Sequence, residues 1–206
     1  MKKLRFEDSK LSKADWNTLK ALNTPGKIQD FLNSLSWNHD KTGMSHMSVA
    51  MTLKARKAHC FEGALVGALA LWIQGQKPLL LDLKTVRPDF DHVVTLFKVG
   101  NYWGAISKTN HSVLRYRDPI YKSVRELVMS YFHEYFLDNG KKTLRNYSKP
   151  YDLSKGAFDK WLSGEENLAW LAHELDQSPH LNIITKIQVK NLRKAEEIEV
   201  KASNIT

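Results

Sequence analysis

The sequence predicts an α+β protein, because its helical and strand patterns fall into separate blocks. Apolar residues recur at helical spacing after Cys60 in the stretch AHCFEGALVGALALW,. Two β-type segments follow, at residues 92–99 and 102–107, and Gly100-Asn101 between them is typical of a tight hairpin turn,. Helical patterns then return toward the C-terminus. Such separation is typical of an antiparallel sheet packed on helices.

The N-terminal segment is predicted to be helical, followed by a loop. Ser12 and Thr24 each stand where an N-cap is expected, ahead of apolar residues at helical spacing,. Residues 36–48 are polar and irregular. Their histidines, His39 and His46, lack the spacing of a metal-binding motif, so we expect a surface loop and no metal site.

The central helix is predicted to be buried and to begin near Cys60. Gly75 is expected to end it, and Pro78 prevents its continuation,. The small residues Gly63 and Gly67 would let neighbouring chains approach closely. The apolar run that follows, residues 78–84, predicts a buried strand.

The remaining pattern predicts further elements and no dividing linker. They are a third strand at residues 113–114, a helix from 118 to 140, a basic loop at 141–150, helices at 154–162 and 163–175, a segment at 181–189 that is either strand or helix, and a terminal strand at 197–202. We therefore expect a single domain over residues 1–206, with a core at about 24–137 and a helical C-terminal extension at about 150–206.

Composition narrows the cellular setting and the partners. The chain has 206 residues and one cysteine, which excludes an internal disulfide and fits a reducing cytoplasm,. No apolar run is long enough to span a bilayer, and no signal-peptide pattern follows the basic N-terminus. The net charge of +9 favours encounters with polyanions, although the lysines are scattered,. The best nucleic-acid patch combines Lys141, Lys142 and Arg145 with Tyr147.

Cys60 and His92 are the candidate catalytic pair. A helix N-terminus favours an anion, so a thiol placed there is shifted toward thiolate. His92 follows 32 residues later (92 − 60) at the start of a strand. The hairpin brings residues 107–110 to the same end as His92, where a polar side chain could orient the imidazole.

These segments resemble the transglutaminase-like superfamily, a branch of the papain-like cysteine enzymes. The matching pieces are AHCFEGALVGALALWIQG, DHVVTLF and GNYWGAIS, within residues 53–110. The resemblance implies a papain-like core in which an antiparallel sheet packs on the cysteine-bearing helix, with extra helices at both ends. It also implies that Cys60 is the nucleophile and His92 the base. Trp103 occupies the family's tryptophan position, and we expect it to contact substrate together with His59.

The third catalytic position departs from the family pattern. An aspartate usually follows that tryptophan by four residues, and Ser107 stands there instead. Asn110 is the alternative, because an asparagine carbonyl can accept a bond from the imidazole without adding charge. We favour Asn110 over Ser107. Asp91 is a poorer orienting residue, because it would point to the opposite face of the strand from His92.

The expected function is thiol-dependent acyl chemistry on an amide or ester, by a hydrolase or an acyltransferase that acts on protein or peptide and needs no cofactor. The backbone N–H of Cys60 would stabilise the oxyanion, but the run KARKAH before it lacks the glutamine that papain-like enzymes use as second donor,. Two alternatives remain: a catalytically inactive binding domain with the same fold, favoured by the missing aspartate, and a basic nucleic-acid-associated protein.

Overall fold

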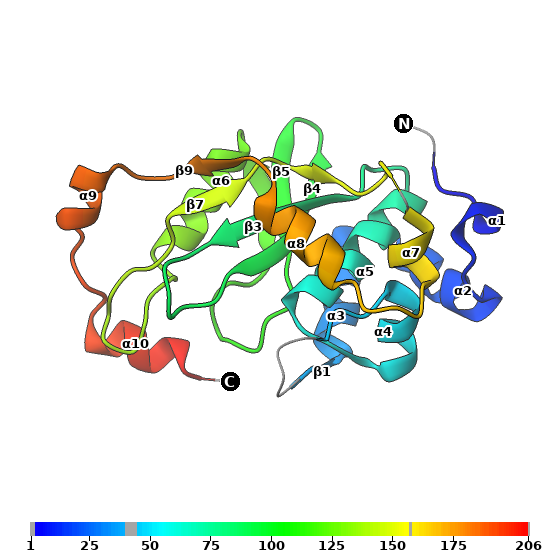
Figure 1. Cartoon of the computed structure of the whole chain (residues 1–206), viewed down its shortest axis with the longest axis horizontal. Helices are drawn as coiled ribbons and strands as arrows, with labels where there is room; N and C mark the ends of the chain where they lie inside the picture. The colour runs from blue at the N-terminus through cyan, green and yellow to red at the C-terminus, as the bar shows by residue number, and fades with distance from the viewer. Residues whose placement is uncertain (1–2, 40–44, 157, 206) are drawn as a thin grey trace.

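The centre of the protein is an antiparallel sheet with helices on both faces. The computed structural model describes residues 3–39, 45–156 and 158–205. Figure 1 shows most of the helices gathered at one end of the molecule and the sheet extending toward the other. The predicted α+β class is confirmed.

The described helices are α1 (Phe6–Ser9), α2 (Lys13–Ala21), α3 (Pro25–Ser34), α4 (Val49–Ala55), α5 (Cys60–Ile73), α6 (Val124–Phe132), α7 (Phe158–Ser163), α8 (Ala169–Gln177), α9 (Lys186–Lys190) and α10 (Glu197–Ser203). The described strands are β1 (Ser36–Trp37), β2 (Lys57–Ala58), β3 (Leu79–Lys84), β4 (His92–Val99), β5 (Tyr102–Ile106), β6 (Arg117–Tyr121), β7 (Asn146–Ser148), β8 (Tyr151–Asp152) and β9 (His180–Asn182).

The main sheet has seven strands in the order β6-β5-β4-β3-β7-β9, with β8 also paired to β3. All its pairs are antiparallel, whereas β1 and β2 form a separate parallel pair. The hairpin of β4 and β5 turns at Gly100, whose φ of 58° suits a glycine,. Its register pairs Thr95 with Ile106, so the start of β4 lies beside the residues that follow β5.

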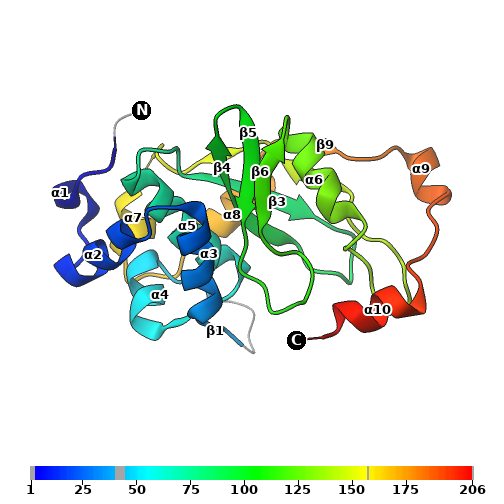
Figure 2. The same ribbon diagram turned by 180° about the vertical axis from the view of Figure 1, so that it is seen from behind.

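Each face of the sheet carries its own apolar core. One core joins the sheet to α5 and the N-terminal helices, and it includes Leu65, Leu80 and Ile106. The other joins the opposite face to α6 and includes Leu81, Val94 and Tyr131. Figure 2 shows α6 against β5 and β6, away from the helical end. Successive side chains of a strand point to opposite faces of the sheet. Because β3 and β4 have nearly continuous apolar sequences, both faces have to be covered, and they are.

α5 begins at Cys60, as predicted, and packs closely on β4. A Cβ on Gly67 would lie 2.8 Å from Thr95 Oγ1, which itself donates to the Ala64 carbonyl at 2.6 Å. A Cβ on Gly63 would lie 2.4 Å from the Cβ of Lys108. The two glycines therefore bring the first turns of α5 against the segments that carry the candidate catalytic residues.

Several predicted elements differ in the structure. The helix expected from residue 118 starts at Val124, where the Ser123 side chain accepts a bond from Glu126 N, and it ends at Phe132. Pro119 lies instead in β6, an edge strand, where its missing N–H costs nothing,. Because Leu114 has a φ of 60°, the expected strand at 113–114 does not form, and β6 begins three residues later.

The C-terminal part is not a purely helical extension. The loop expected at 141–150 contains β7, and β8 and β9 add further strands to the sheet. The short strand expected at 197–202 is the helix α10, which has no buried residue. Helices were correctly predicted for most of α7 and α8. Residues 40–44 of the predicted polar loop lie outside the described residues.

Two findings bear on cellular setting and partners. Across the described ranges, no helix has the length and apolar character that a membrane crossing requires. In the proposed basic patch, Tyr147 is buried in the core beside α6, so its ring is not open for stacking on a base.

Candidate active site

Cys60 is the first residue of α5 and is partly exposed. The helix is 14 residues long, so its N-terminal dipole and free N–H groups act directly on the sulfur,. The preceding residue, His59, is the N-cap: its ring accepts a bond from Phe61 N at 3.2 Å. The sequence therefore places the thiol where an anion is favoured.

A buried carboxylate holds this helix start in place. Glu62 is fully buried and accepts bonds from the side chains of Asn38 and Ser45 and from the backbone N–H groups of Met47 and His59. These bonds compensate the charge, which would otherwise be costly to bury. They also tie the loop before α4 to the first turn of α5, so the surroundings of Cys60 are fixed from two segments.

His92 opens β4 and lines the same cavity as Cys60, and it contributes to lowering the pKa of the Cys60 thiol. Its Nε2 atom lies 2.8 Å from Ser107 Oγ, and that hydroxyl lies 2.6 Å from the Leu114 carbonyl oxygen. The carbonyl only accepts, so the Ser107 proton must point to Leu114. Ser107 then accepts from Nε2–H, which leaves Nδ1 unprotonated and available as a base for the thiol.

The backbone around Ser107 is fixed by residues distant in sequence. Gln29 on α3 forms two bonds to it, accepting from Ser107 N at 2.9 Å and donating to Ser107 O at 2.8 Å. Leu114 N donates to Glu134 at 2.8 Å, which holds Leu114 in its left-handed conformation. A non-glycine residue in that region is strained. The two hydrogen bonds of Leu114, to Glu134 and from Ser107, hold this conformation and keep its carbonyl at the Ser107 hydroxyl.

The electrostatics favour a thiolate. Burial alone would raise the pKa of Cys60, but hydrogen bonds from His59 and His92 and their charges bring it well below the ordinary value. Burial alone would lower the pKa of His59, but its bond to Cys60 and the charges of Cys60 and Glu62 raise it to about 9.

His59 has two roles that use different protonation states. Its Nε2 atom lies 2.7 Å from the Ser45 carbonyl and must donate there, so the neutral ring has Nδ1 free to accept from Phe61 N,. A proton on Nδ1 removes this capping bond and places an imidazolium beside the sulfur. Protonation therefore exchanges helix capping for an ion pair with the thiolate.

Two cavities meet at Cys60. The first, of about 460 Å³, is lined by residues that include His92, Asn110, His111 and Tyr135. The second, of about 660 Å³, lies toward α8. Both are lined by Cys60 and by Phe90, whose side chain is 77% exposed. The thiol thus lies between two hollows, with an exposed aromatic ring at their junction.

The structure separates the predicted site residues into two groups. Cys60, His59, His92 and Ser107 lie together. Among the described residues, no hydrogen bond joins Asn110 to His92, although Asn110 lines the first cavity. The contact with His92 is therefore made by Ser107 and not by Asn110, the residue that the sequence favours for this role.

Trp103 and Asp91 lie apart from the imidazole. Trp103 is at the far end of β5, under Lys98, and lines a different cavity with Gln76 and Pro150. It lines neither Cys60 cavity, so it is not placed to contact substrate there. Asp91 accepts from Thr85 N and Oγ1 and does not orient the ring.

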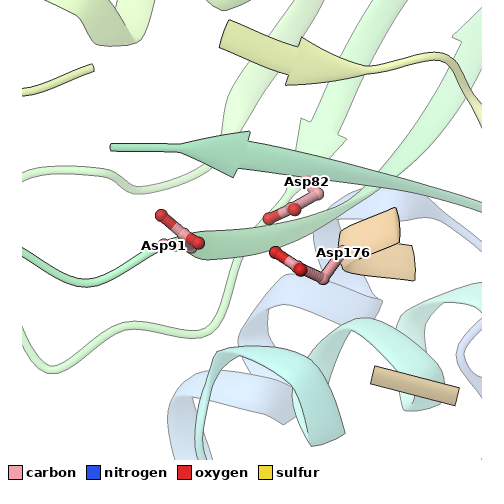
Figure 3. Close-up of side chains that lie close together, drawn as sticks. All are labelled: Asp82, Asp91 and Asp176. Carbon is pink, nitrogen blue, oxygen red and sulfur yellow. The ribbon is translucent and has the colours of Figure 1, made fainter. Parts of the chain in front are cut away.

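Three carboxylates border the second cavity and could hold a hard cation. Figure 3 shows Asp82 from β3, Asp91 from the residue before β4 and Asp176 from α8, and their ligand atoms lie within 4.8 Å of one another. Each already has a protein partner: Asp82 pairs with His180 at 3.2 Å, and Asp176 with Lys84 at 2.6 Å. Burial and then the charge of Asp91 raise the pKa of Asp82 to about 6. We assign no metal to this cluster.

Sequence reasoning missed the residues that support the pair. Gln29, Glu62 and Leu114 act through hydrogen bonds across the fold, and Tyr135 lines the first cavity. Only Glu62 carried a local signal, a carboxylate three residues after an N-cap position,. The other three have no sequence pattern that identifies them.

A scan of family models finds no match to this chain, and a search of curated proteins finds none either.

Proposed function

We propose that this protein is a cysteine-dependent enzyme that transfers or hydrolyses acyl groups of amides or esters. The observation that carries the proposal is the arrangement of Cys60, His92 and Ser107: a thiol at a helix N-terminus, an imidazole that lines the same cavity and a hydroxyl that fixes the tautomer of that imidazole. A nucleophile, a base and an orienting group in this order make up the general arrangement for nucleophilic catalysis.

The reaction would follow from these positions. The Cys60 sulfur attacks the carbonyl carbon, and the carbonyl π electrons move to the oxygen, which becomes an oxyanion. Collapse of this intermediate expels the amine or alcohol, which takes the thiol-derived proton from His92, and leaves a thioester on Cys60. Water or a primary amine then attacks the thioester, with His92 accepting its proton, and the free thiolate returns.

Ser107 would replace the carboxylate or amide that usually orients such a histidine. It supplies a hydrogen bond without a charge, so the imidazolium is less stabilised than beside an aspartate. His59 offsets this, because it provides a second cationic group next to the sulfur when its ring is protonated. The geometry therefore favours a thiolate maintained by two histidines.

We also propose that the fold is a papain-like core of the transglutaminase-like type. Three features support this assignment: the cysteine begins a buried helix, the histidine begins a strand of an antiparallel sheet packed on that helix, and the site lies between the helical end and the sheet. The hollows on both sides of Cys60, with Phe90 between them, suit an extended acyl donor such as a peptide.

The test uses the fact that Cys60 is the only cysteine. We expect one iodoacetamide adduct, formed at neutral pH much faster than on a free thiol, and a pH profile shifted well below a pKa of about 8.5. His92→Ala should slow alkylation at pH 7. His111→Ala, which changes a histidine of the same cavity, is the matched control and should leave the rate within about two-fold,.

The acyl step is tested with 4-nitrophenyl acetate and a library of peptide amides. Wild-type protein should form an acetyl adduct on Cys60, and Cys60→Ser should not. Adding a fluorescent primary amine separates the two outcomes, because transfer labels the amine and hydrolysis releases acetate. Ordinary alkylation kinetics together with no acetyl adduct would contradict the proposal.

A further inference from the structure

Tyr135 has a buried hydroxyl that makes no hydrogen bond within the described residues, and Tyr135 lines the cavity that contains the candidate nucleophile. It follows α6, its side chain is 3% exposed, and it is one of three buried polar side chains in the described residues whose atoms lack any partner. The others are Asn146 and Trp170, and neither lines a cavity next to Cys60. Tyr135 does line the first cavity, together with Cys60 and His92.

A buried hydroxyl without a hydrogen-bond partner lowers the stability of the folded state. Leaving such a donor unsatisfied costs about 1–3 kcal/mol, and buried polar groups in native proteins rarely lack partners. A phenylalanine would fill the same apolar space without that cost. A substrate group bound in the cavity would supply the missing acceptor.

The hydroxyl stays protonated, because burial and the negative charge on the Cys60 sulfur both raise its pKa. Burial, followed by the negative charges of Cys60 and of nearby aspartates, raises the pKa of Tyr135 well above its ordinary value. It is therefore a hydrogen-bond donor throughout the pH range in which the thiolate exists. A neutral donor on a side chain that lines the cavity of the nucleophile is suited to stabilise an oxyanion there,.

We propose that the Tyr135 hydroxyl is the second oxyanion donor of this site, acting with the backbone N–H of Cys60. This inference rests on the proposed function. When the sulfur attacks a carbonyl carbon, the oxygen gains the electron pair of the broken π bond, and the hydroxyl donates to it. The bond is strongest in the tetrahedral intermediate and weakens when the carbonyl reforms, so it lowers the barrier to acylation.

The experiment compares two reactions of the same thiolate in Tyr135→Phe. Alkylation by iodoacetamide is a displacement that forms no oxyanion, whereas acylation by 4-nitrophenyl acetate does. Loss of one oxyanion donor lowers turnover by about 10²–10³ in hydrolases. We expect acylation to fall by at least ten-fold, with alkylation and its pH profile unchanged within two-fold.

The matched control is Tyr131→Phe. Tyr131 is also buried, but its hydroxyl donates to the Arg115 carbonyl at 2.9 Å. Its loss should lower thermal stability and leave the ratio of acylation to alkylation unchanged. Tyr135→Phe should unfold at the same temperature as wild type or higher, because no bond is lost.

The outcomes separate the inference from the function on which it rests. Equal acylation by wild type and Tyr135→Phe overturns the role of Tyr135 and leaves the enzyme proposal standing. Equal loss of both reactions shows that Tyr135 supports the thiolate or the fold instead, which also overturns the inference. A wild-type protein that alkylates but never acylates removes the proposed function, and the inference with it.

Discussion

Replacing Ser107 with alanine tests how the imidazole is oriented. The substitution removes the acceptor for His92 Nε2–H and the donor to the Leu114 carbonyl, and both groups are nearly inaccessible to solvent. Each unsatisfied buried group costs about 1–3 kcal/mol, so the free energy of unfolding should fall by roughly 2–6 kcal/mol. Thermal denaturation measures this loss.

The catalytic effect follows from the tautomer. Without Ser107, the ring proton is no longer held on Nε2 and can occupy Nδ1, which then cannot accept the thiol proton. General acid–base catalysis contributes about 10²–10⁴-fold, and the ring stays packed, so we expect acylation of Cys60 to slow by about 10- to 100-fold. The pH profile of alkylation should also move upward, an effect that lost stability alone would not produce.

Asn110→Ala is the control, because Asn110 lines the same cavity without bonding to His92. It should retain acylation within about two-fold. The reverse result, in which Asn110→Ala is inactive and Ser107→Ala is active, would refute the orientation mechanism derived from the structure.

Two further predictions concern stability. The pKa of Asp82 is raised from 3.8 to about 6, so the folded state holds this proton more tightly than the unfolded state and stability falls as pH rises from 4 to 6,. Two pKa units correspond to about 3 kcal/mol. Asp82→Asn should therefore unfold at a higher denaturant concentration than wild type at pH 7, but not at pH 4. The same difference between variant and wild type at both pH values would show that the Asp82 charge is not the cause. Gly67→Ala places a methyl 2.8 Å from Thr95 Oγ1, so its free energy of unfolding in urea titrations should fall by about 1–3 kcal/mol,. The control is Gly26→Ala, which has open space around its Cβ and should leave the free energy of unfolding unchanged or raise it,. Equal stability of the two variants would mean that α5 and β4 are not in close contact.

Local patterns were sufficient for the elements that have strong local signals. The helix that starts at Cys60 and the hairpin at Gly100 combine clear periodicity with a capping or turn residue, the strand at 79–84 is a continuous apolar run, and each forms where expected. Predictions were wrong where a residue's local preference depends on its position in the sheet. Pro119 resembles a helix start, but an edge strand tolerates it equally well,.

The sequence alone determined the α+β class, the place of Cys60 at a helix start and the position of His92 at a strand start, because periodicity and capping are local properties of the chain. Only the tertiary structure decided which side chains meet. It placed Ser107, and not Asn110, against the imidazole, moved Trp103 away from the thiol and brought Gln29, Leu114 and Tyr135 to the site. These contacts depend on sheet register and on the backbone conformation of Leu114, which are set by the packing of the whole fold.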